Sequence, residues 1–303
     1  MTYSIVARDP VTGSMGVAVE SHYFGTGRSV TWAEAGVGAV ATQAVVEVGY
    51  GPRGLEGIRG GSSATALLRR LVAADPMSAL RQVAMIDAKG DVAAHTGADC
   101  IAEAGHRIGA EVSVQANMMA RATVPAAMLE TFASAAGKEL SERLMLALEA
   151  AEREGGDVRG RQSAAMLVVS GKRSETPWTE RLVDLRVDDH PEPLVELRRL
   201  LEASRAFDRL FAVFQSGMLF APTAPSDREL ADALAELDAT QKTVAPNPEP
   251  TFWQAVLLAK AGRGEEARAK LDEACKTNPG WRDLVVRLVP LGVVPADSPL
   301  LRR

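Results

Sequence analysis

The stretch TYSIVARDPVTGSMGVAVES, residues 2–21, predicts the opening elements of the fold. Residues 2–8 and residues 15–21 each alternate between two sets of side chains with a period of two, which is typical of β-strands. The segment DPVTG at residues 9–13 joins them and has the Asp-Pro and Gly chemistry of a short turn. We therefore predict a β-hairpin whose first strand begins directly at Thr2.

Thr2 follows the initiator methionine without any polar lead-in. Removal of that methionine, which a small second residue allows, would leave a free α-amine beside the Thr2 hydroxyl. A threonine paired with its own N-terminal amine is a known form of activated nucleophile. The ordinary pKa of an α-amine, about 7.7–8.0, suits a general base near neutral pH. Thr2 is therefore either an ordinary strand residue or a catalytic nucleophile.

The register of the hairpin decides which side chain lies beside Thr2. If the apolar faces of the two strands pair, Thr2 lies opposite Glu20, and a slip by one residue places it opposite Ser21. Either polar side chain could hydrogen-bond the amine or the hydroxyl, so both are candidate catalytic residues. The alternative is that Glu20 and Ser21 merely end a strand.

Acyl transfer also needs donors aimed at the negative charge that develops on the carbonyl oxygen. AGVGA at residues 35–39 and ATQA at residues 41–44 could offer backbone N–H groups or a side-chain amide, and two further amides lie in strand-like segments. The candidate substrate or oxyanion residues are Gly38, Thr42, Gln43, Asn117 and Gln162. Alternatively, the glycines only allow close packing of strands, and the amides only satisfy buried backbone groups.

Beyond the hairpin, strands alternate with pairs of helices. Helical spacing covers residues 50–75 and residues 122–153, the latter with a break at Gly137, and a long amphipathic helix begins near Pro191. The complete order is strands, two helices, strands, two helices, strands and a helix. This order is typical of an α+β domain in which helices cover the outer faces of layered sheets.

The sequence pattern changes from about residue 216, where a segment rich in Pro, Gly and Ser precedes purely helical spacing. We predict an α+β domain over residues 1–215 and a small all-α domain over residues 216–303. One set of positions in the second domain has the spacing of a tetratricopeptide repeat: Trp253, Ala255, Leu258, Gly262, Ala267 and Pro279. A single repeat buries little, so it should lean on the helix at residues 226–242, on the main domain or on a second subunit.

An apolar stripe along this helical segment predicts association of the chain. The stripe consists of Phe252, Val256, Leu257, Leu271, Leu284 and Leu288. Because a single repeat would leave the stripe in water, we expect at least a homodimer. The segment 216–303 is also a candidate surface for a protein partner.

Composition excludes several classes of function. The net charge is −5 without a long basic run, so the phosphate-neutralising surface of a nucleic-acid-binding protein is not evident. Cys100 and Cys275 lie far apart, which indicates no disulfide framework. No run of about 18 apolar residues and no leader before Tyr3 is seen, so we expect a soluble cytoplasmic protein with no membrane span.

Metal ligation is a weaker alternative. His95, Cys100 and His106 share a loop-rich stretch, and Asp188 could join them from a distant segment. A metal-dependent hydrolase using His95, His106 and Asp188 would draw its ligands from separate segments without a compact motif. We therefore predict neither a metal nor an organic cofactor.

Several stretches together resemble one known family. They are TYSIVARDPVTGSMGVAVES, WAEAGVGAVATQA, YGPRGLEGIRGG, AAHTGADCIAEAGHR, QANMM, GRQSAAMLVV and VDLRVDDHPEPLVELRRLL. In order and spacing they are similar, over residues 2–205, to the domain of unknown function 1028 family, which is placed in the N-terminal nucleophile (Ntn) hydrolase superfamily. The resemblance implies an αββα sandwich and hydrolysis of an amide or related C–N bond, and it supplies no substrate.

One feature departs from the proteasome-type branch of that superfamily, which places a lysine near the threonine. The first lysine of this chain is Lys89, and the cations nearer in sequence, Arg8 and Arg28, cannot accept a proton at working pH. The α-amine of Thr2 would therefore have to act as base without a lysine. The missing lysine also supports the view that the fold has lost or changed its chemistry.

These observations lead to two expectations. The first is an Ntn hydrolase in which Thr2 attacks the carbonyl of a small amide and forms an ester that water releases. The Gly-rich loop at residues 25–29 and residues 46–54 would border a compact pocket for that substrate. The second is a non-catalytic binding or assembly protein whose helical tail recruits a partner.

Overall fold

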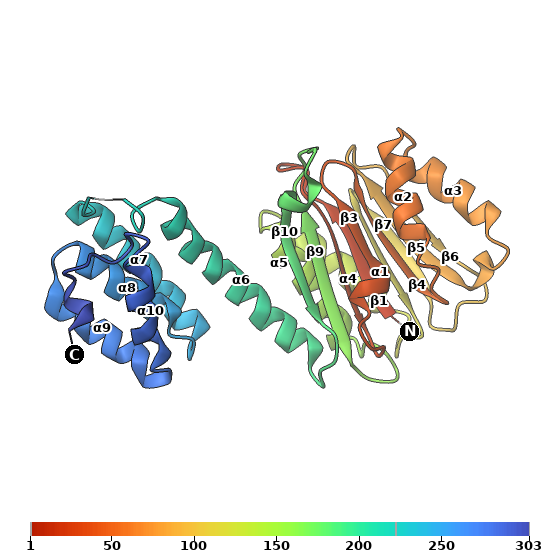
Figure 1. Ribbon diagram of the computed structural model, residues 1–303. Helices are drawn as coiled ribbons and strands as arrows, with labels where there is room; N and C mark the ends of the chain where they lie inside the picture. Colours follow the sequence, from red (N-terminus) through yellow and green to blue (C-terminus); the bar gives the residue numbers. More distant parts are fainter. Residues whose placement is uncertain (1, 222, 303) are drawn as a thin grey trace. The chain divides into compact units, whose positions relative to one another are not determined.

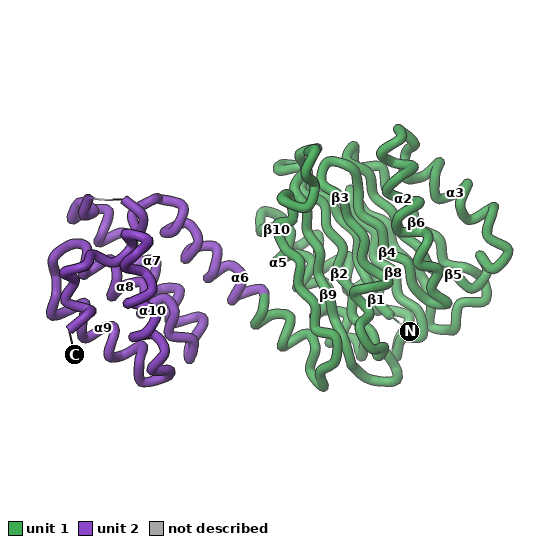
Figure 2. Tube along the Cα trace, in the orientation of Figure 1, with its two compact units in different colours: residues 1–200 green, residues 201–303 purple. Residues whose placement is uncertain are grey.

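The computed structural model describes residues 2–221 and 223–302, which form two compact units. The units comprise residues 1–200 and 201–303 (Figure 2). Their division falls inside helix α6 (Pro193–Gln215), whereas the sequence pattern places the domain boundary where that helix ends. The first unit carries strands and helices, and the second is built from helices.

The predicted hairpin is confirmed. Strands β1 (Thr2–Arg8) and β2 (Met15–Ser21) pair antiparallel along their full length. The turn between them closes through a hydrogen bond of 2.8 Å from the Asp9 N–H to the Ser14 carbonyl. Gly13 takes a positive φ of 73° in this turn, a conformation that glycine adopts without a steric penalty.

The register of the hairpin differs from the first of the two alternatives. Tyr3 pairs with Glu20, so the prediction that Thr2 lies opposite Glu20 is wrong, and the slipped register beside Ser21 is the observed one. Both strands are buried on both faces, so apolar side chains lie on either side and do not select one register. The length of the turn selects it instead.

Every strand pairing in the described residues is antiparallel, and the strands form two sheets. The six-stranded sheet has the order β10-β9-β2-β1-β8-β7, with β7 (Gly105–Gly109), β8 (Val112–Asn117), β9 (Ser163–Val169) and β10 (Arg181–Val187). The four-stranded sheet has the order β3-β4-β5-β6, with β3 (Thr31–Glu34), β4 (Gly38–Ala44), β5 (Arg81–Asp87) and β6 (Val92–Thr96). Strands β3 and β7 are short and partly exposed.

Helices cover the outer face of each sheet, which makes the first unit an αββα sandwich (Figure 1). Helices α4 (Val124–Ser134) and α5 (Leu140–Arg153) pack on the six-stranded sheet. Helices α2 (Tyr50–Arg59) and α3 (Ala64–Ala74) pack on the four-stranded sheet, and the single turn α1 (Gly27–Val30) precedes β3. The predicted α+β sandwich is confirmed.

Local signals in the sequence set several helix boundaries. Ser63 caps α3 by accepting a hydrogen bond of 3.3 Å from the N–H of Ala66. Gly137, with a φ of 88°, separates α4 from α5 as predicted. Short 3₁₀ turns η1 (Ser78–Leu80) and η2 (Pro177–Glu180) lead into strands β5 and β10.

Small apolar residues fill the space between the two sheets. Val17 and Val19 of β2 pack in one core cluster with Ala39 and Ala41 of β4 and with Ile86 of β5. Alanine side chains at these positions let the two sheets approach closely.

The second unit is helical throughout. Its helices are α7 (Asp227–Val244), α8 (Glu249–Lys260), α9 (Gly264–Thr277) and α10 (Gly280–Leu288), followed by the 3₁₀ turn η3 (Pro299–Leu301). A capping box begins α7: the Ser226 hydroxyl accepts from the N–H of Glu229, whose carboxylate accepts from the Ser226 N–H. Among the described residues, no helix is both long and apolar enough to span a lipid bilayer.

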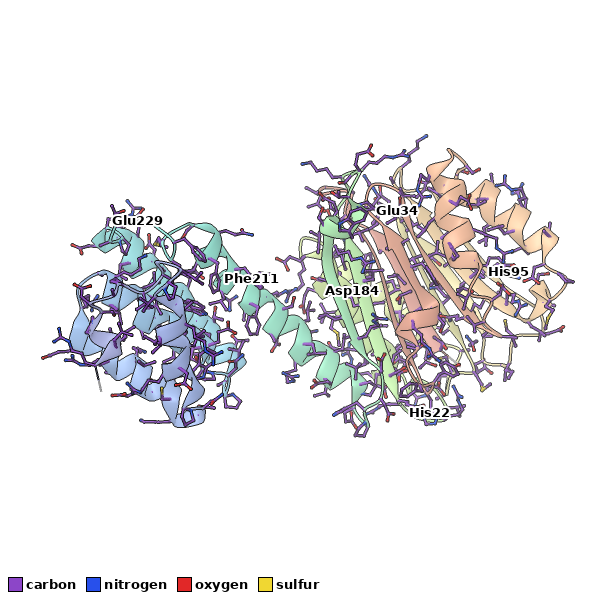
Figure 3. The ribbon with its side chains drawn as sticks, in the orientation of Figure 1. His22, Glu34, His95, Asp184, Phe211 and Glu229 are labelled. Carbon is purple, nitrogen blue, oxygen red and sulfur yellow. The ribbon has the colours of Figure 1, made fainter. Side chains whose placement is uncertain are left out.

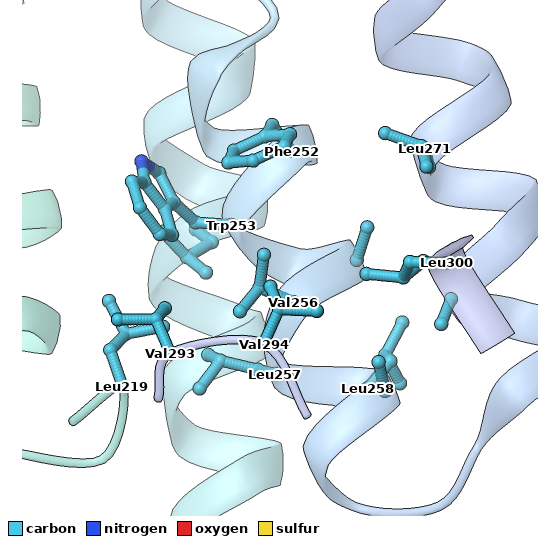
Figure 4. Packing of buried hydrophobic residues seen from close by; sticks show 14 of the residues in the cluster. Leu219, Phe252, Trp253, Val256, Leu257, Leu258, Leu271, Val293, Val294 and Leu300 are labelled. Carbon is cyan, nitrogen blue, oxygen red and sulfur yellow. The ribbon is translucent and has the colours of Figure 1, made fainter. Parts of the chain in front are cut away.

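The apolar stripe of this unit is covered by its own helices, so the expectation that it lies in water is wrong. Phe252, Val256, Leu257 and Leu271 are fully buried in one cluster (Figure 4). The same cluster includes residues of α6 and α7 and of the segment after α10. Gln254 on α8 also donates a hydrogen bond of 2.6 Å to Asp238 on α7. The sequence predicts that the helices with tetratricopeptide-like spacing, α8 and α9, pack on the preceding helix, on the main domain or on a second subunit. The structure shows them packed with the preceding helix, α7.

Gly38 provides a test of the close packing at the start of β4. A Cβ on Gly38 would lie 2.5 Å from the carbonyl oxygen of Ile86, a backbone atom that cannot move aside cheaply. We expect Gly38→Ala to lower the free energy of unfolding by about 1–3 kcal/mol, measured by urea denaturation. The matched control is Gly105→Ala at the start of β7, where a Cβ would meet nothing within 4 Å. Equal stability of the two variants would contradict this account.

Candidate functional site

Thr2 lies at the start of β1, in the middle of the six-stranded sheet, with Asn117 of β8 as its pairing partner. Its side chain points toward the four-stranded sheet, because it shares the face of β1 that carries Ser4 and Val6. The Thr2 Oγ1 lies 3.0 Å from the Ser21 Oγ, and either hydroxyl could donate. Of the two predicted neighbours of Thr2, Ser21 is therefore the one whose side chain reaches its hydroxyl.

Two side-chain amides hold the backbone of Thr2. Gln43 donates to the Thr2 carbonyl at 3.1 Å, and Asn117 donates to the same oxygen at 3.3 Å. Both amides also donate to the Oε1 of Gln82, at 2.7 Å and 2.9 Å respectively. An amide nitrogen carries two hydrogens, so these contacts engage the donors of both groups. In this arrangement Gln43 and Asn117 position Thr2, whereas the sequence suggests them as donors to substrate.

Gln82 of β5, which the sequence analysis does not single out, is the centre of this network. Its Nε2 donates to the Thr96 hydroxyl of the same sheet at 2.9 Å. It also donates to the Ala116 carbonyl at 2.9 Å, across the interface between the sheets. The Gln82 side chain is fully buried, and buried polar groups of this kind are normally fully hydrogen-bonded. Its sequence signal is a polar side chain on the interlayer face of β5, where Ala84 and Ile86 are apolar.

A second pair of buried groups extends the network along β1. The Ser4 hydroxyl donates to Gln43 Oε1 at 2.6 Å and accepts from Gln115 Nε2 at 2.6 Å. Thr2 and Ser4 are thus both tied to Gln43, which comes from the opposite sheet. A satisfied network of this kind is rigid, because each member loses hydrogen bonds if another moves.

The residues after the two positioning amides have unusual backbone conformations. Ala44 follows Gln43 with a φ of 68°, and Met118 follows Asn117 with a φ of 60°. Non-glycine residues rarely adopt this left-handed region, and they keep it only where their surroundings hold them there. The strain lies at the same end of the sandwich as Thr2, where strands β4 and β8 finish.

Glu20 lies on the other face of the six-stranded sheet, together with its pairing partner Tyr3. The Tyr3 hydroxyl donates to Glu152 of α5 at 2.8 Å. Burial raises the pKa of the Glu20 carboxyl well above its ordinary value, and the charges of Glu152 and Asp157 add to the rise. The Tyr3 hydroxyl and the backbone N–H of Gln162 offset part of the shift, although neither completes a hydrogen bond to the carboxylate.

Three other predicted candidates have different surroundings. Gly38 begins β4, at the opposite end of that strand from Gln43, and it allows close packing against β5. The buried Thr42 hydroxyl donates to the carbonyl of Glu47 at 3.1 Å. Gln162 is partly exposed and donates to Asp189 at 3.1 Å. The hydrogen bonds of Thr42 and Gln162 thus go to residues other than Thr2, and Gly38 lies at the far end of β4.

The histidines of the loop-rich stretch have local partners. The His95 ring nitrogen Nε2 lies 2.8 Å from the Ser78 carbonyl, and His106 Nδ1 lies 2.8 Å from the Thr96 hydroxyl. Burial lowers the pKa of His106, and the neighbouring charges of His95 and Arg107 lower it further. Within residues 2–221 and 223–302, no three His, Cys, Asp or Glu side chains form a cluster that could hold a metal ion.

The two segments predicted to border one pocket border different cavities. Residues 25–29 contribute Gly27 and Arg28 to a cavity of about 210 Å³. Residues 46–54 border another cavity. Its volume is about 330 Å³, and its lining includes Glu47, Tyr50, Arg53 and Arg81. Burial and the neighbouring Asp75 raise the pKa of Tyr50 to about 12. The cavity lies at the Thr2 end of the sandwich, because Arg81 pairs with Ala44, the residue after Gln43.

Comparison with known proteins adds a family relationship and no activity. The family model described as "Family of unknown function (DUF1028)" matches residues 2–197. Among solved structures, the chain is similar to the crystal structure of protein SPO2555 from Silicibacter pomeroyi, which carries the same family model. The identity is 32% and the TM-score 0.59, and the match covers 66% of this chain and 88% of that one. No curated protein matches the chain.

The raised pKa of Glu20 predicts a pH dependence of stability. The folded state holds the Glu20 proton more tightly than the unfolded chain does, where the pKa is about 4.5. This contribution to stability is fully present below pH 4.5 and is lost as the pH rises toward the folded-state pKa. We expect Glu20→Gln to raise the melting temperature at pH 8 and to change it little at pH 4. The exposed Glu130→Gln serves as control, and equal shifts in both variants would refute the assignment.

The Gln82 network predicts a second effect on stability. In Gln82→Leu, the buried amides of Gln43 and Asn117 lose a shared acceptor, and the Ala116 carbonyl loses a donor. We expect the free energy of unfolding to fall by about 2–3 kcal/mol, measured by urea denaturation. The partly exposed Gln162→Leu should change it by less than about 0.5 kcal/mol. An unchanged stability of Gln82→Leu would show that the network does not hold the two sheets together.

Proposed function

This chain belongs to the DUF1028 family, and we propose that it is an Ntn hydrolase that cleaves the amide C–N bond of a small substrate. The observation that carries the proposal is the placement of Thr2. It begins a central strand, its hydroxyl contacts the Ser21 hydroxyl, and its carbonyl is held by two buried amides. The αββα sandwich of the first unit agrees with the architecture that the superfamily resemblance implies.

The proposed mechanism requires removal of Met1, which lies outside the described residues. The freed α-amine of Thr2 accepts the proton of Oγ1 as Oγ1 attacks the substrate carbonyl carbon. The tetrahedral intermediate then collapses, the C–N bond breaks, and the α-ammonium gives its proton to the leaving amine. This step leaves an ester between the substrate acyl group and Oγ1.

Water completes the cycle. The α-amine accepts a proton from the water molecule as the water oxygen attacks the ester carbonyl. As this second intermediate collapses, the ester bond breaks and the α-ammonium returns its proton to the departing Oγ1, which restores the Thr2 hydroxyl and releases a carboxylic acid. Ser21, at 3.0 Å from Oγ1, orients the nucleophile through a hydroxyl–hydroxyl contact.

Arg8, the cation on β1, does not compete with the α-amine for the role of base. Arg8 lies at the far end of the strand and forms an ion pair of 2.7 Å with Glu111. A guanidinium cannot accept a proton at working pH, so Arg8 could not replace the amine even if it were closer. In this proposal, Gln43, Asn117 and Gln82 keep the amine and hydroxyl in place by fixing the backbone of Thr2.

The second candidate function is that of a non-catalytic assembly protein. It is favoured by the second unit, whose helices enclose a hydrophobic cluster of their own. The helix pair α8 and α9, with the spacing of a tetratricopeptide repeat, would then recruit a protein partner. We also propose that the protein is a cytoplasmic homodimer. The apolar stripe of the second unit does not supply its interface, because that stripe is buried among the helices of the same unit.

The hydrolase proposal makes a direct prediction about the mature chain. Intact mass spectrometry of the active protein should give a mass that lacks one methionine. Thr2→Ala should fold like the wild type and lose turnover of small amides by more than about 1,000-fold, because it lacks the nucleophile. Thr2→Ser should keep part of the activity. Amine release from a library of small amides and N-acyl amino acids provides the measurement.

Two results would overturn this proposal. One is full activity of protein that retains Met1, because its acylated nitrogen is no base. The other is unchanged turnover in Thr2→Ala with normal circular dichroism. If the mature wild type releases no amine from any substrate while residues 216–303 capture a stoichiometric partner, the assembly function is favoured instead.

A further inference from the structure

Exposed apolar side chains gather at the Thr2 end of the first unit. Tyr23, Phe24, Ile101 and Val158 are each more than half exposed, and they lie in loops that follow or precede the strand ends around Thr2. The loop at residues 45–48 adds three exposed valines at the same end. Among the described residues, the turns at the opposite end expose only Val11 and Trp178 as large apolar side chains.

Backbone hydrogen bonds attach two of these side chains to the strand that pairs with Thr2. Met118 directly follows Asn117, the pairing partner of Thr2. The Met118 N–H donates to the Ile101 carbonyl at 3.0 Å, and the Val158 N–H donates to the Met118 carbonyl at 3.3 Å. Ile101 and Val158 therefore flank Met118 on both sides, within one residue of the Thr2–Asn117 pair.

The left-handed backbone of Met118 indicates that this arrangement is held under strain. Its φ of 60° is costly for a residue with an unbranched side chain and no turn-forming polar group. Such strain is found preferentially at ligand-binding and catalytic sites, where the surroundings fix a particular side-chain direction.

Tyr23 and Phe24 reach the same end of the sandwich from β2. They follow Ser21 and His22, and Figure 3 shows His22 at the lower edge of the first unit. The Ser163 hydroxyl donates to the Tyr23 carbonyl at 2.5 Å, and Ser163 pairs with Ser21 across the sheet. Tyr23 and Phe24 are thus held by Ser163, which pairs with Ser21, the residue whose hydroxyl contacts the Thr2 hydroxyl.

The acidic group closest to this surface in sequence is neutralised. The carboxylate of Asp157 accepts from the His22 N–H at 3.1 Å and forms an ion pair of 3.1 Å with Arg159. Its side chain is fully buried, so it does not present an unpaired charge beside Val158. Asp157 therefore leaves the Val158 side of this surface without an unpaired charge, and the exposed Asp99 and Glu103 on either side of Ile101 are its charged neighbours.

We propose that Tyr23, Phe24, Ile101, Met118 and Val158 form an apolar rim that binds the acyl chain of the substrate. This inference rests on the proposed function, and it narrows the substrate class to amides of medium-length aliphatic or aryl carboxylic acids. Met118 follows Asn117, the pairing partner of Thr2, and Tyr23 lies two residues after Ser21, so an acyl chain held on the rim would have its carbonyl at the Thr2 end of the sheet.

The size of the rim favours a small ligand over a second protein. A stable protein interface involves about 20–30 residues on each side, far more than the rim offers. Burial of an alkyl chain needs only a few apolar side chains, and each buried methylene strengthens binding about fourfold.

The test separates binding from turnover. Dissociation constants of acetyl, butyryl and hexanoyl p-nitroanilide are measured by calorimetry on Thr2→Ala, which cannot consume them, and kcat/KM is measured on the wild type. We expect the affinity for Thr2→Ala to rise by more than about tenfold from the butyryl to the hexanoyl compound. Adding Ile101→Ser or Val158→Ser should flatten this dependence, and adding Val11→Ser or Trp178→Ser at the opposite end should leave it unchanged.

The possible outcomes have distinct meanings. An affinity that does not depend on chain length, or a dependence that survives Ile101→Ser, overturns the rim. Light scattering tests whether a second copy of the chain covers this surface. If Ile101→Ser lowers the molar mass from that of a dimer to that of a monomer, a second copy binds there and the acyl-chain proposal is wrong. Graded binding to Thr2→Ala without any wild-type turnover supports the rim and rejects the hydrolase. Turnover without chain-length dependence supports the hydrolase and rejects the rim.

Discussion

Two hydrogen bonds, from Asn117 to the Gln82 Oε1 and from Gln43 to the Thr2 carbonyl, join the two sheets at the end where Thr2 lies, and Gln82 also accepts from Gln43. Gln43 comes from the four-stranded sheet and Asn117 from the six-stranded sheet, and both bind the Thr2 carbonyl. Because all three amide side chains are buried, each must keep its partners or leave a costly unpaired group. The position of Thr2 is therefore coupled to the packing of the whole sandwich.

The same end of the sandwich contains features that stability alone would not favour. Glu20 is a buried carboxyl with a raised pKa, and Ala44 and Met118 have left-handed backbones. Exposed aromatic and aliphatic side chains also lie in the surrounding loops. Features of this kind usually survive where a ligand or a reaction requires them, which is why we place the function at this end.

The two units contribute in different ways. The first unit contains Thr2 and its network, and the second unit encloses a separate apolar cluster. The DUF1028 match ends at residue 197, so the family relationship applies to the first unit. The second unit lies outside the matched residues, and its role can be tested independently of Thr2.

The sequence by itself determined the hairpin, the helix pairs and the change to an all-helical segment, because period and turn chemistry act over a few residues. It also pointed to Thr2, Ser21, Gln43 and Asn117. Only the tertiary structure decided that Thr2 lies beside Ser21, because strands buried on both faces have no apolar pattern that selects one register. The role of Gln82 and the covering of the C-terminal stripe likewise depended on contacts between residues far apart in the chain, which no local pattern records.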